Sequence, residues 1–275
     1  MTAVASFYVF RPLNDLDALR NSLDEACAAE RLKGTVLLAR EGVNAALAGR
    51  RPGIERVVAA YFPEADVKWS TADADNPVFD RLKVRLKPEI VTFGLELSPA
   101  TRVGAHVDAA TWDRLLSDPT VTVLDVRNGY ESDIGTFRGA RCTDTGTFGE
   151  FRDFVARELD PGQDRRLALF CTGGIRCEKA SAYLIERGFE DVCQLGGGIL
   201  GYLAEMGADS AFEGECFVFD QRVSVTGRLA RGHHALCDRC GRAIPSDVPR
   251  SVACPACRGC TASGGGQAER LNPRL

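Results

Sequence analysis

The sequence predicts two α/β units followed by a small cysteine-rich segment. Strand-like and helix-like patterns alternate along residues 5–97, a second buried strand at residues 166–170 leads into a glycine-containing loop at 171–176, and cysteines are concentrated in residues 237–260. A length of 275 residues also fits two domains with an appendage better than one domain. We therefore expect three parts, at residues 1–98, 99–215 and 216–275.

The first unit combines both hydrophobic periodicities. Leu16, Leu19 and Leu23 recur at helical spacing behind an acidic cap, whereas residues 82–91 alternate as a strand does. The expected elements are a strand at 6–10, a helix at 15–30, strands at 34–39 and 44–48 around a hairpin turn, a helix at 54–61 and a strand at 82–91. This β-α-β-β-α-β order is that of a ferredoxin-like α+β sandwich.

The second unit follows a linker at residues 99–107. Its strands are apolar on both faces, as buried parallel strands are. The expected elements are a helix around 112–116, strands at 121–126 and 166–170, a helix after residue 175 and a strand at 192–195. The pattern predicts a doubly wound α/β domain. Residues 237–260 have too few apolar residues for a core of their own, and we expect the glycine-rich last residues to be disordered.

The composition is that of an ordinary folded protein, with 45% apolar and 26% charged residues. The net charge of −4 argues against wholesale electrostatic binding to nucleic acid but permits a local basic patch. The first residues lack the basic stretch of a signal peptide, and no apolar run is long enough to cross a bilayer. Together with an odd count of 11 cysteines, these features favour a cytoplasmic protein with reduced thiols and no membrane association.

The loop of residues 171–176, called here the cysteine loop, places Cys171 between a buried strand and a helix. Its small residues let backbone N–H groups approach the sulfur, and the helix N-terminus adds partial positive charge. Such a site favours a thiolate and would stabilise a persulfide. A buried structural thiol is the alternative, but it would not need these neighbours. We expect Cys171 and Arg176 to be catalytic, with a loop formed by Thr172, Gly173, Gly174 and Ile175.

Cys177 is a second thiol directly after the cysteine loop. It could resolve an intermediate on Cys171. Because free cysteines are often buried packing residues, the packing role is favoured over the resolving role.

Arg81, Lys83, Arg85 and Lys87, called here the basic strip, fall on one face of an alternating strand. Their spacing of about 6 to 7 Å is comparable to that of successive phosphates on a single strand. A solvated face that discourages edge-to-edge pairing fits the pattern equally well.

Cys237, Cys240, Cys254 and Cys257 form two CxxC pairs separated by thirteen residues. Four thiolates at this spacing can close a tetrahedral structural zinc site, which would stabilise a segment without a core. Unliganded cysteines are the less favoured alternative.

Several sequence segments resemble those of known families. Asp125-Val126-Arg127, Tyr130-Glu131, Gly135, Gly139-Ala140 and the cysteine loop resemble the rhodanese superfamily, whose first loop cysteine forms the persulfide and corresponds to Cys171. Residues 32–44, 81–87 and 171–180 together resemble the bacterial oxygen-dependent tRNA uridine-34 hydroxylases, over roughly residues 5 to 220.

This resemblance implies a ferredoxin-like domain, a rhodanese domain and a cysteine-rich tail. It implies an oxidoreductase that converts uridine 34 of tRNA to 5-hydroxyuridine with molecular oxygen as co-substrate and Cys171 as the catalytic thiol, and it favours tRNA contact for the basic strip. The residues themselves indicate no flavin, nicotinamide or iron site and no protein partner. A thiosulfate or persulfide sulfurtransferase and a non-catalytic tRNA-binding module are the alternatives.

Overall fold

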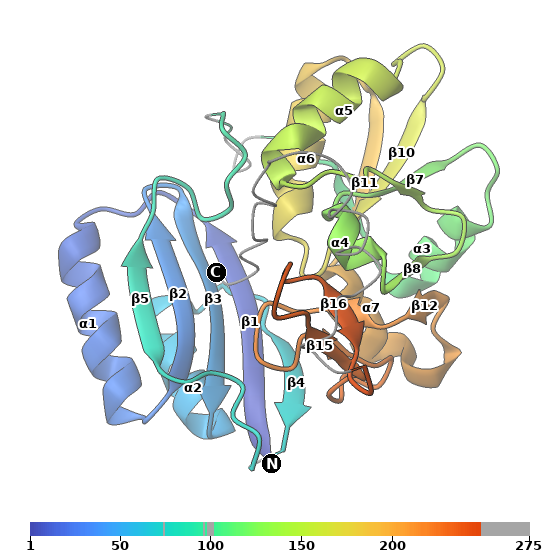
Figure 1. The fold of residues 1–275 in the computed structure, drawn as a ribbon. Helices are drawn as coiled ribbons and strands as arrows, with labels where there is room; N and C mark the ends of the chain where they lie inside the picture. Colours follow the sequence, from blue (N-terminus) through green and yellow to red (C-terminus); the bar gives the residue numbers. More distant parts are fainter. Residues whose placement is uncertain (74, 96, 98–101, 249–275) are drawn as a thin grey trace, which may run out of the picture.

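The computed structural model describes residues 1–73, 75–95, 97 and 102–248. Two five-stranded sheets, each with its own helices, lie next to each other in it (Figure 1). Within these ranges, none of the helices combines the length and the apolar character needed to cross a membrane.

The first sheet has the strand order β4-β1-β3-β2-β5. Its elements are β1 (Thr2–Phe10), α1 (Leu16–Ala29), β2 (Lys33–Ala39), β3 (Gly42–Gly49), α2 (Arg51–Tyr61), β4 (Lys68–Ala72) and β5 (Leu82–Leu86). Strands β1 to β4 pair antiparallel, whereas β5 runs parallel to β2. The ferredoxin-like prediction for this unit is confirmed.

One strand of this unit differs from the prediction. The alternation at residues 82–91 predicts the last strand of the β-α-β-β-α-β order, but that strand is β4, and β5 is an additional strand at the opposite edge. β4 lacks a clear pattern because it is a short edge strand in which Ala72 alone is a buried residue, although Trp69 packs against the core. One buried residue in five leaves no alternation to detect.

Only one face of the first sheet is covered by its helices. Phe7 and Val43 pack against Leu23 of α1 and Ile54 of α2, and the apolar side chains of β5 join the same core. The expected alternation of β5 is therefore confirmed. The opposite face remains available to the second sheet.

The second sheet is entirely parallel, with the order β6-β11-β10-β7-β9. Its region comprises β6 (Ala105–Val107), α3 (Ala109–Leu116), β7 (Thr122–Asp125), α4 (Gly129–Ser132), β8 (Gly135–Phe137), β9 (Arg141–Cys142), a 3-10 turn (Phe148–Glu150), α5 (Phe151–Glu158), β10 (Arg166–Phe170), α6 (Ile175–Glu186), β11 (Asp191–Leu195) and α7 (Gly198–Met206). α5 and α6 contribute to the core on one face, and α3 and α7 to the core on the other. The doubly wound prediction is confirmed, although β6 lies in the expected linker because its three mostly exposed residues carry no apolar signal.

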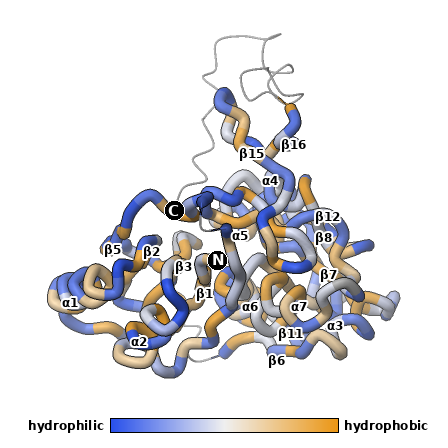
Figure 2. Tube along the Cα trace, turned by 90° about the horizontal axis from the view of Figure 1, so that it is seen from below, coloured by the Kyte–Doolittle hydropathy of each residue, from blue (hydrophilic) through white to orange (hydrophobic). Residues whose placement is uncertain are grey.

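Short hairpins follow the second sheet. One is formed by β13 (Cys216–Phe217) and β14 (Ser224–Val225), the other by β15 (His234–Leu236) and β16 (Ala243–Pro245), while β12 (Phe212–Gly214) before them pairs with the distant β8. β13 and β14 extend the core of the second sheet. The β15–β16 hairpin projects from the body (Figure 2) and buries little beyond Cys237 and Ile244.

A buried lysine of the second unit, Lys179, forms ion pairs with two glutamates of the first unit. Lys179 of α6 is fully buried, and its Nζ lies 2.9 Å from Glu41 Oε1 and 2.6 Å from Glu89 Oε2. It also donates to the carbonyl of Val91. Because a buried ammonium is costly unless its hydrogen bonds are satisfied, this cluster fixes the helix of the cysteine loop against the first unit.

Candidate active site

The structure places Cys171 where the sequence predicts it. β10 ends at Phe170 and α6 begins at Ile175, so the thiol lies in the turn between a parallel strand and a helix N-terminus. Gly174 has φ of 98°, a conformation that favours glycine, and its N–H donates to Cys171 Sγ at 3.2 Å. The residue is fully buried.

This environment favours the thiolate. Burial alone would raise the pKa of Cys171, but hydrogen bonds from the Cys177 thiol and from backbone N–H groups, together with the charge of Arg176, lower it to about 6. At neutral pH most of the protein therefore carries a nucleophilic sulfur anion. This is the state expected for a catalytic cysteine rather than for a packing thiol.

The structure places Cys177 in the core and also next to Cys171. Its side chain is fully buried in the core on the α6 face, as a packing residue would be. Its thiol is also hydrogen-bonded to Cys171, and burial and that neighbouring sulfur raise the pKa of Cys177 well above its usual range. The neutral thiol is thus a hydrogen-bond donor to the thiolate.

Arg176 is held in place by Glu131 of α4. Its two terminal nitrogens lie 2.5 and 2.7 Å from the two carboxylate oxygens, and both side chains are almost completely buried. Although burial opposes the charged form, Glu131 holds the pKa of Arg176 above its usual value. The bidentate pair provides a rigid cation beside the sulfur. Thr172 completes it by a longer contact of its hydroxyl to Glu131 at 3.4 Å.

Cys171 lies at the wall of a cavity of about 1000 Å³, called here the cysteine cavity. Thr172, Gly173, Ile175 and Arg176 line it from the second sheet's side, so the structure brings the predicted loop residues together around one space. Asn44 and other residues of the first sheet's uncovered face line the other side. The cavity is therefore formed by both units.

Tyr8 and Lys68 are site residues that the sequence did not reveal. Tyr8 Oη donates to Glu178 Oε1 at 2.7 Å, and Glu178 in turn contacts His106 and Gln194. Lys68 is almost buried, with its Nζ 4.8 Å from the centre of the Tyr8 ring. The one available signal was the position of Tyr8 on β1, where the alternation turns it away from the core.

The basic strip lies on β5 and its two flanks. Its cations emerge on the face opposite the apolar residues that pack toward α1. Among the residues that the structure describes, none forms an ion pair with the strip's side chains. They are therefore free to neutralise an external anion.

Two of the four predicted zinc ligands can be placed. Cys237 and Cys240 lie on the turn between β15 and β16, where the Gly241 N–H donates to the Cys237 carbonyl at 2.9 Å and Gly241 has φ of 75°. This tight turn fits the first half of a four-thiolate site. Cys254 and Cys257 lie outside the described residues. Within those residues no cluster of three or more candidate metal ligands occurs.

Comparison with known families matches both units. Residues 2–90 match the UPF0176 acylphosphatase like domain, and residues 108–205 match the rhodanese-like domain. Among solved structures, the rhodanese-like domain of an Anabaena protein is 26% identical and covers 40% of this chain and 78% of that one, with a TM-score of 0.33.

Three curated relatives match along most of their length. The chain is 43% identical to a tRNA uridine(34) hydroxylase of Picosynechococcus, covering 92% of this chain and 89% of the relative. It is 47% identical to one of Synechocystis, covering 86% and 87%. It is 44% identical to one of Agrobacterium fabrum, covering 92% and 84%.

Proposed function

Since this chain belongs to the tRNA uridine(34) hydroxylase family, we propose that it hydroxylates uridine 34 of tRNA with Cys171 as the catalytic thiol. The observation that carries the role of Cys171 is its position at a cavity of about 1000 Å³ with a pKa lowered to about 6. A cavity of this size can accept a base with its ribose, once the nucleotide is turned out of the anticodon loop.

The proposed product is 5-hydroxyuridine, with molecular oxygen as co-substrate. One oxygen atom replaces hydrogen at C5 of the base, the other leaves as water, and two electrons and two protons enter from a reductant. The chain's own residues bind the base, exclude water and supply a polarised sulfur beside it. Arg176 and the Gly174 N–H stabilise negative charge on that sulfur, whether as thiolate or as persulfide.

The remaining predicted roles are part of the same proposal. The basic strip contacts the tRNA backbone, and Cys237, Cys240, Cys254 and Cys257 hold a structural zinc ion. The three-part division at residues 1–98, 99–215 and 216–275 and a cytoplasmic location fit a tRNA-modifying enzyme.

Isotopic labelling tests the proposed reaction. The purified chain is incubated with unmodified tRNA and a thiol reductant under ¹⁸O₂, and the nucleosides are analysed by mass spectrometry. 5-Hydroxyuridine carrying one ¹⁸O atom is expected. Product with only ¹⁶O would contradict oxygen as the source of the hydroxyl group, and absence of product would contradict the function.

A sulfurtransferase is the second candidate. The observation that favours it is the cysteine loop itself, whose converging N–H groups suit a persulfide. Under that alternative, thiosulfate sulfurtransfer would require Cys171 while deletion of the protein would leave tRNA nucleosides unchanged.

A further inference from the structure

The uncovered face of the first sheet forms a continuous floor from the cysteine cavity to the basic strip. The strand registers align one residue from each strand in a row on this face: Lys68, Ser6, Ala46, Thr35 and Lys83. The first three line the cysteine cavity and the last two line a second cavity. With about 4.8 Å between strands, the row spans about 19 Å, which an extended single strand covers in about three nucleotides.

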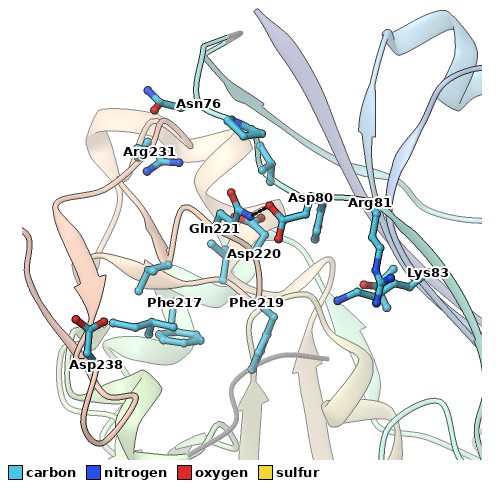
Figure 3. A pocket seen from close by; sticks show the side chains of 17 residues that line it. Asn76, Asp80, Arg81, Lys83, Phe217, Phe219, Asp220, Gln221, Arg231 and Asp238 are labelled. Carbon is cyan, nitrogen blue, oxygen red and sulfur yellow. Dashed lines mark hydrogen bonds between the residues drawn. The ribbon is translucent and has the colours of Figure 1, made fainter. Parts of the chain in front are cut away.

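The second cavity, called here the edge cavity, has a volume of about 470 Å³. Figure 3 shows Arg81 and Lys83 of the first unit on one side and Phe219 with Asp220 on the other. Val218, Phe219 and Asp220 also line the cysteine cavity, so this short segment is the wall that the two cavities share.

Phe219 is the part of this wall best suited to contact a base. Its side chain is only partly buried, and its ring packs edge-on against the buried Phe217 with centroids 5.3 Å apart. The Arg176 guanidinium lies 5.9 Å from the ring centre, which connects the ring directly to the cysteine loop. A partly exposed aromatic ring at the wall of a cavity can stack a base of any sequence.

Acidic and basic side chains both line the edge cavity, and Arg81 and Lys83 are its cations on the side of the basic strip. Asp220 is paired with Arg222, and Asp80 accepts a hydrogen bond from Gln221 at 2.6 Å (Figure 3). Asp238 and Arg231 both line the cavity on the side away from Arg81 and Lys83 (Figure 3). Arg81 and Lys83 make no ion pair with any residue in the described part of the chain, so their charge can neutralise a phosphate.

We propose that the edge cavity binds a nucleotide flanking the modified uridine, with its base stacked on Phe219 and its phosphate held by Lys83 and Arg81. This inference rests on the proposed function, because it takes uridine 34 to occupy the cysteine cavity. Because stacking on a ring does not discriminate between bases, the edge cavity would accept any base at this position. Its binding would hold the anticodon loop open while the target uridine reaches Cys171.

A coupling experiment tests this site. A fluorescein-labelled 17-nucleotide anticodon stem-loop with uridine 34 is prepared intact and with an abasic site at position 33, 35 or, as a distant control, 38. Binding to the full chain is measured by fluorescence anisotropy for the wild type and for Phe219→Ala, Phe219→Leu and Phe219→Tyr. Circular dichroism checks the fold of each variant.

For the wild type, an abasic site at 33 or at 35 is expected to weaken binding about tenfold, and one at 38 to have no effect. Phe219→Ala and Phe219→Leu should bind the intact RNA about tenfold more weakly than the wild type. For these variants, the abasic site that weakens wild-type binding, at 33 or at 35, should cause no further loss of affinity. Phe219→Tyr should behave like the wild type. A leucine variant that stays as sensitive as the wild type at both positions would overturn the inference, even if the alanine variant fails to fold.

The phosphate contact has its own control. Lys83→Ala should weaken binding to the intact stem-loop and reduce its salt dependence, whereas Arg20→Ala on α1, at the opposite face of the sheet, should leave both unchanged. Equal effects of the two variants would contradict a specific phosphate site. Failure of the wild type to bind the intact stem-loop would instead contradict tRNA as the substrate, and with it both proposals.

Discussion

Replacing Cys177 with alanine is expected to raise the pKa of Cys171. The pKa of Cys171 is lowered from 9.0 to about 6, which corresponds to about 4 kcal/mol in favour of the thiolate. A hydrogen bond to a charged group contributes about 1.5 to 3 kcal/mol, so loss of the Cys177 thiol should raise the pKa by about 1 to 2 units. At pH 7 the thiolate fraction would fall from about nine-tenths to between about a half and a tenth.

Alkylation measures this pKa directly, because the thiolate is the reacting form. The rate of iodoacetamide addition is followed against pH by mass spectrometry of tryptic peptides. Cleavage after Arg176 separates Cys171 from Cys177, and the exposed Cys142 is an internal reference. In the wild type the reactive thiolate is present above pH of about 6 and is lost as the pH falls below it.

Cys177→Ser is the matched control, since its hydroxyl keeps a donor at the same place. The serine variant should keep the pKa of Cys171 within about half a unit of the wild type. An alanine variant with an unchanged pKa would refute the hydrogen-bond reasoning. A serine variant with a normal pKa but no hydroxylation would show that Cys177 acts as a resolving thiol.

Three further predictions follow from the fold and its surface. Reversing all four charges of the basic strip should leave the fold intact but weaken tRNA binding. In a filter-binding salt titration, the slope of log affinity against log salt should fall by about 0.7 per lost contact. An unchanged slope would mean that the strip is only solvated surface. In urea denaturation, Lys179→Met should lower the free energy of unfolding by about 3 kcal/mol, because two carboxylates lose their shared cation. The matched control is Lys87→Met at an exposed position, which should change the free energy of unfolding by less than about 0.5 kcal/mol. Metal-replete expression should give one zinc per chain by elemental analysis, and less than about half an equivalent would count against the four-cysteine site.

The elements with strong periodicity could be predicted from the sequence, as could the position of Cys171 between a buried strand and a helix. α1 follows its leucine spacing and begins after Asp15, whose side chain accepts the Ala18 N–H. The cysteine loop could be located because its signals are local in the sequence. A buried strand ends directly before Cys171, and the glycines directly after it allow the tight turn. β4 and β6 escaped prediction because these short edge strands bury too few residues to show a hydrophobic period.

The other wall of the site could not be predicted, because it depends on how two units pack. Nothing in the sequence distinguishes Tyr8 and Lys68 from other polar residues on or near strands. They become part of the cavity only when the Lys179 cluster holds α6 against the first unit. The contacts of Lys179 join residues 88 to 138 positions apart, and no local pattern encodes them.

The measurement that tests the account most directly is the modification supported by Cys171→Ser. Serine keeps the size of the side chain but replaces an ionised sulfur with a hydroxyl that stays protonated at neutral pH. The wild type and Cys171→Ser are each expressed in a strain lacking the endogenous enzyme. The 5-hydroxyuridine-derived nucleosides are then quantified by mass spectrometry. Cys171→Ser should fold and bind tRNA like the wild type while leaving these nucleosides essentially absent. Near-normal modification by this variant would contradict a catalytic role for Cys171.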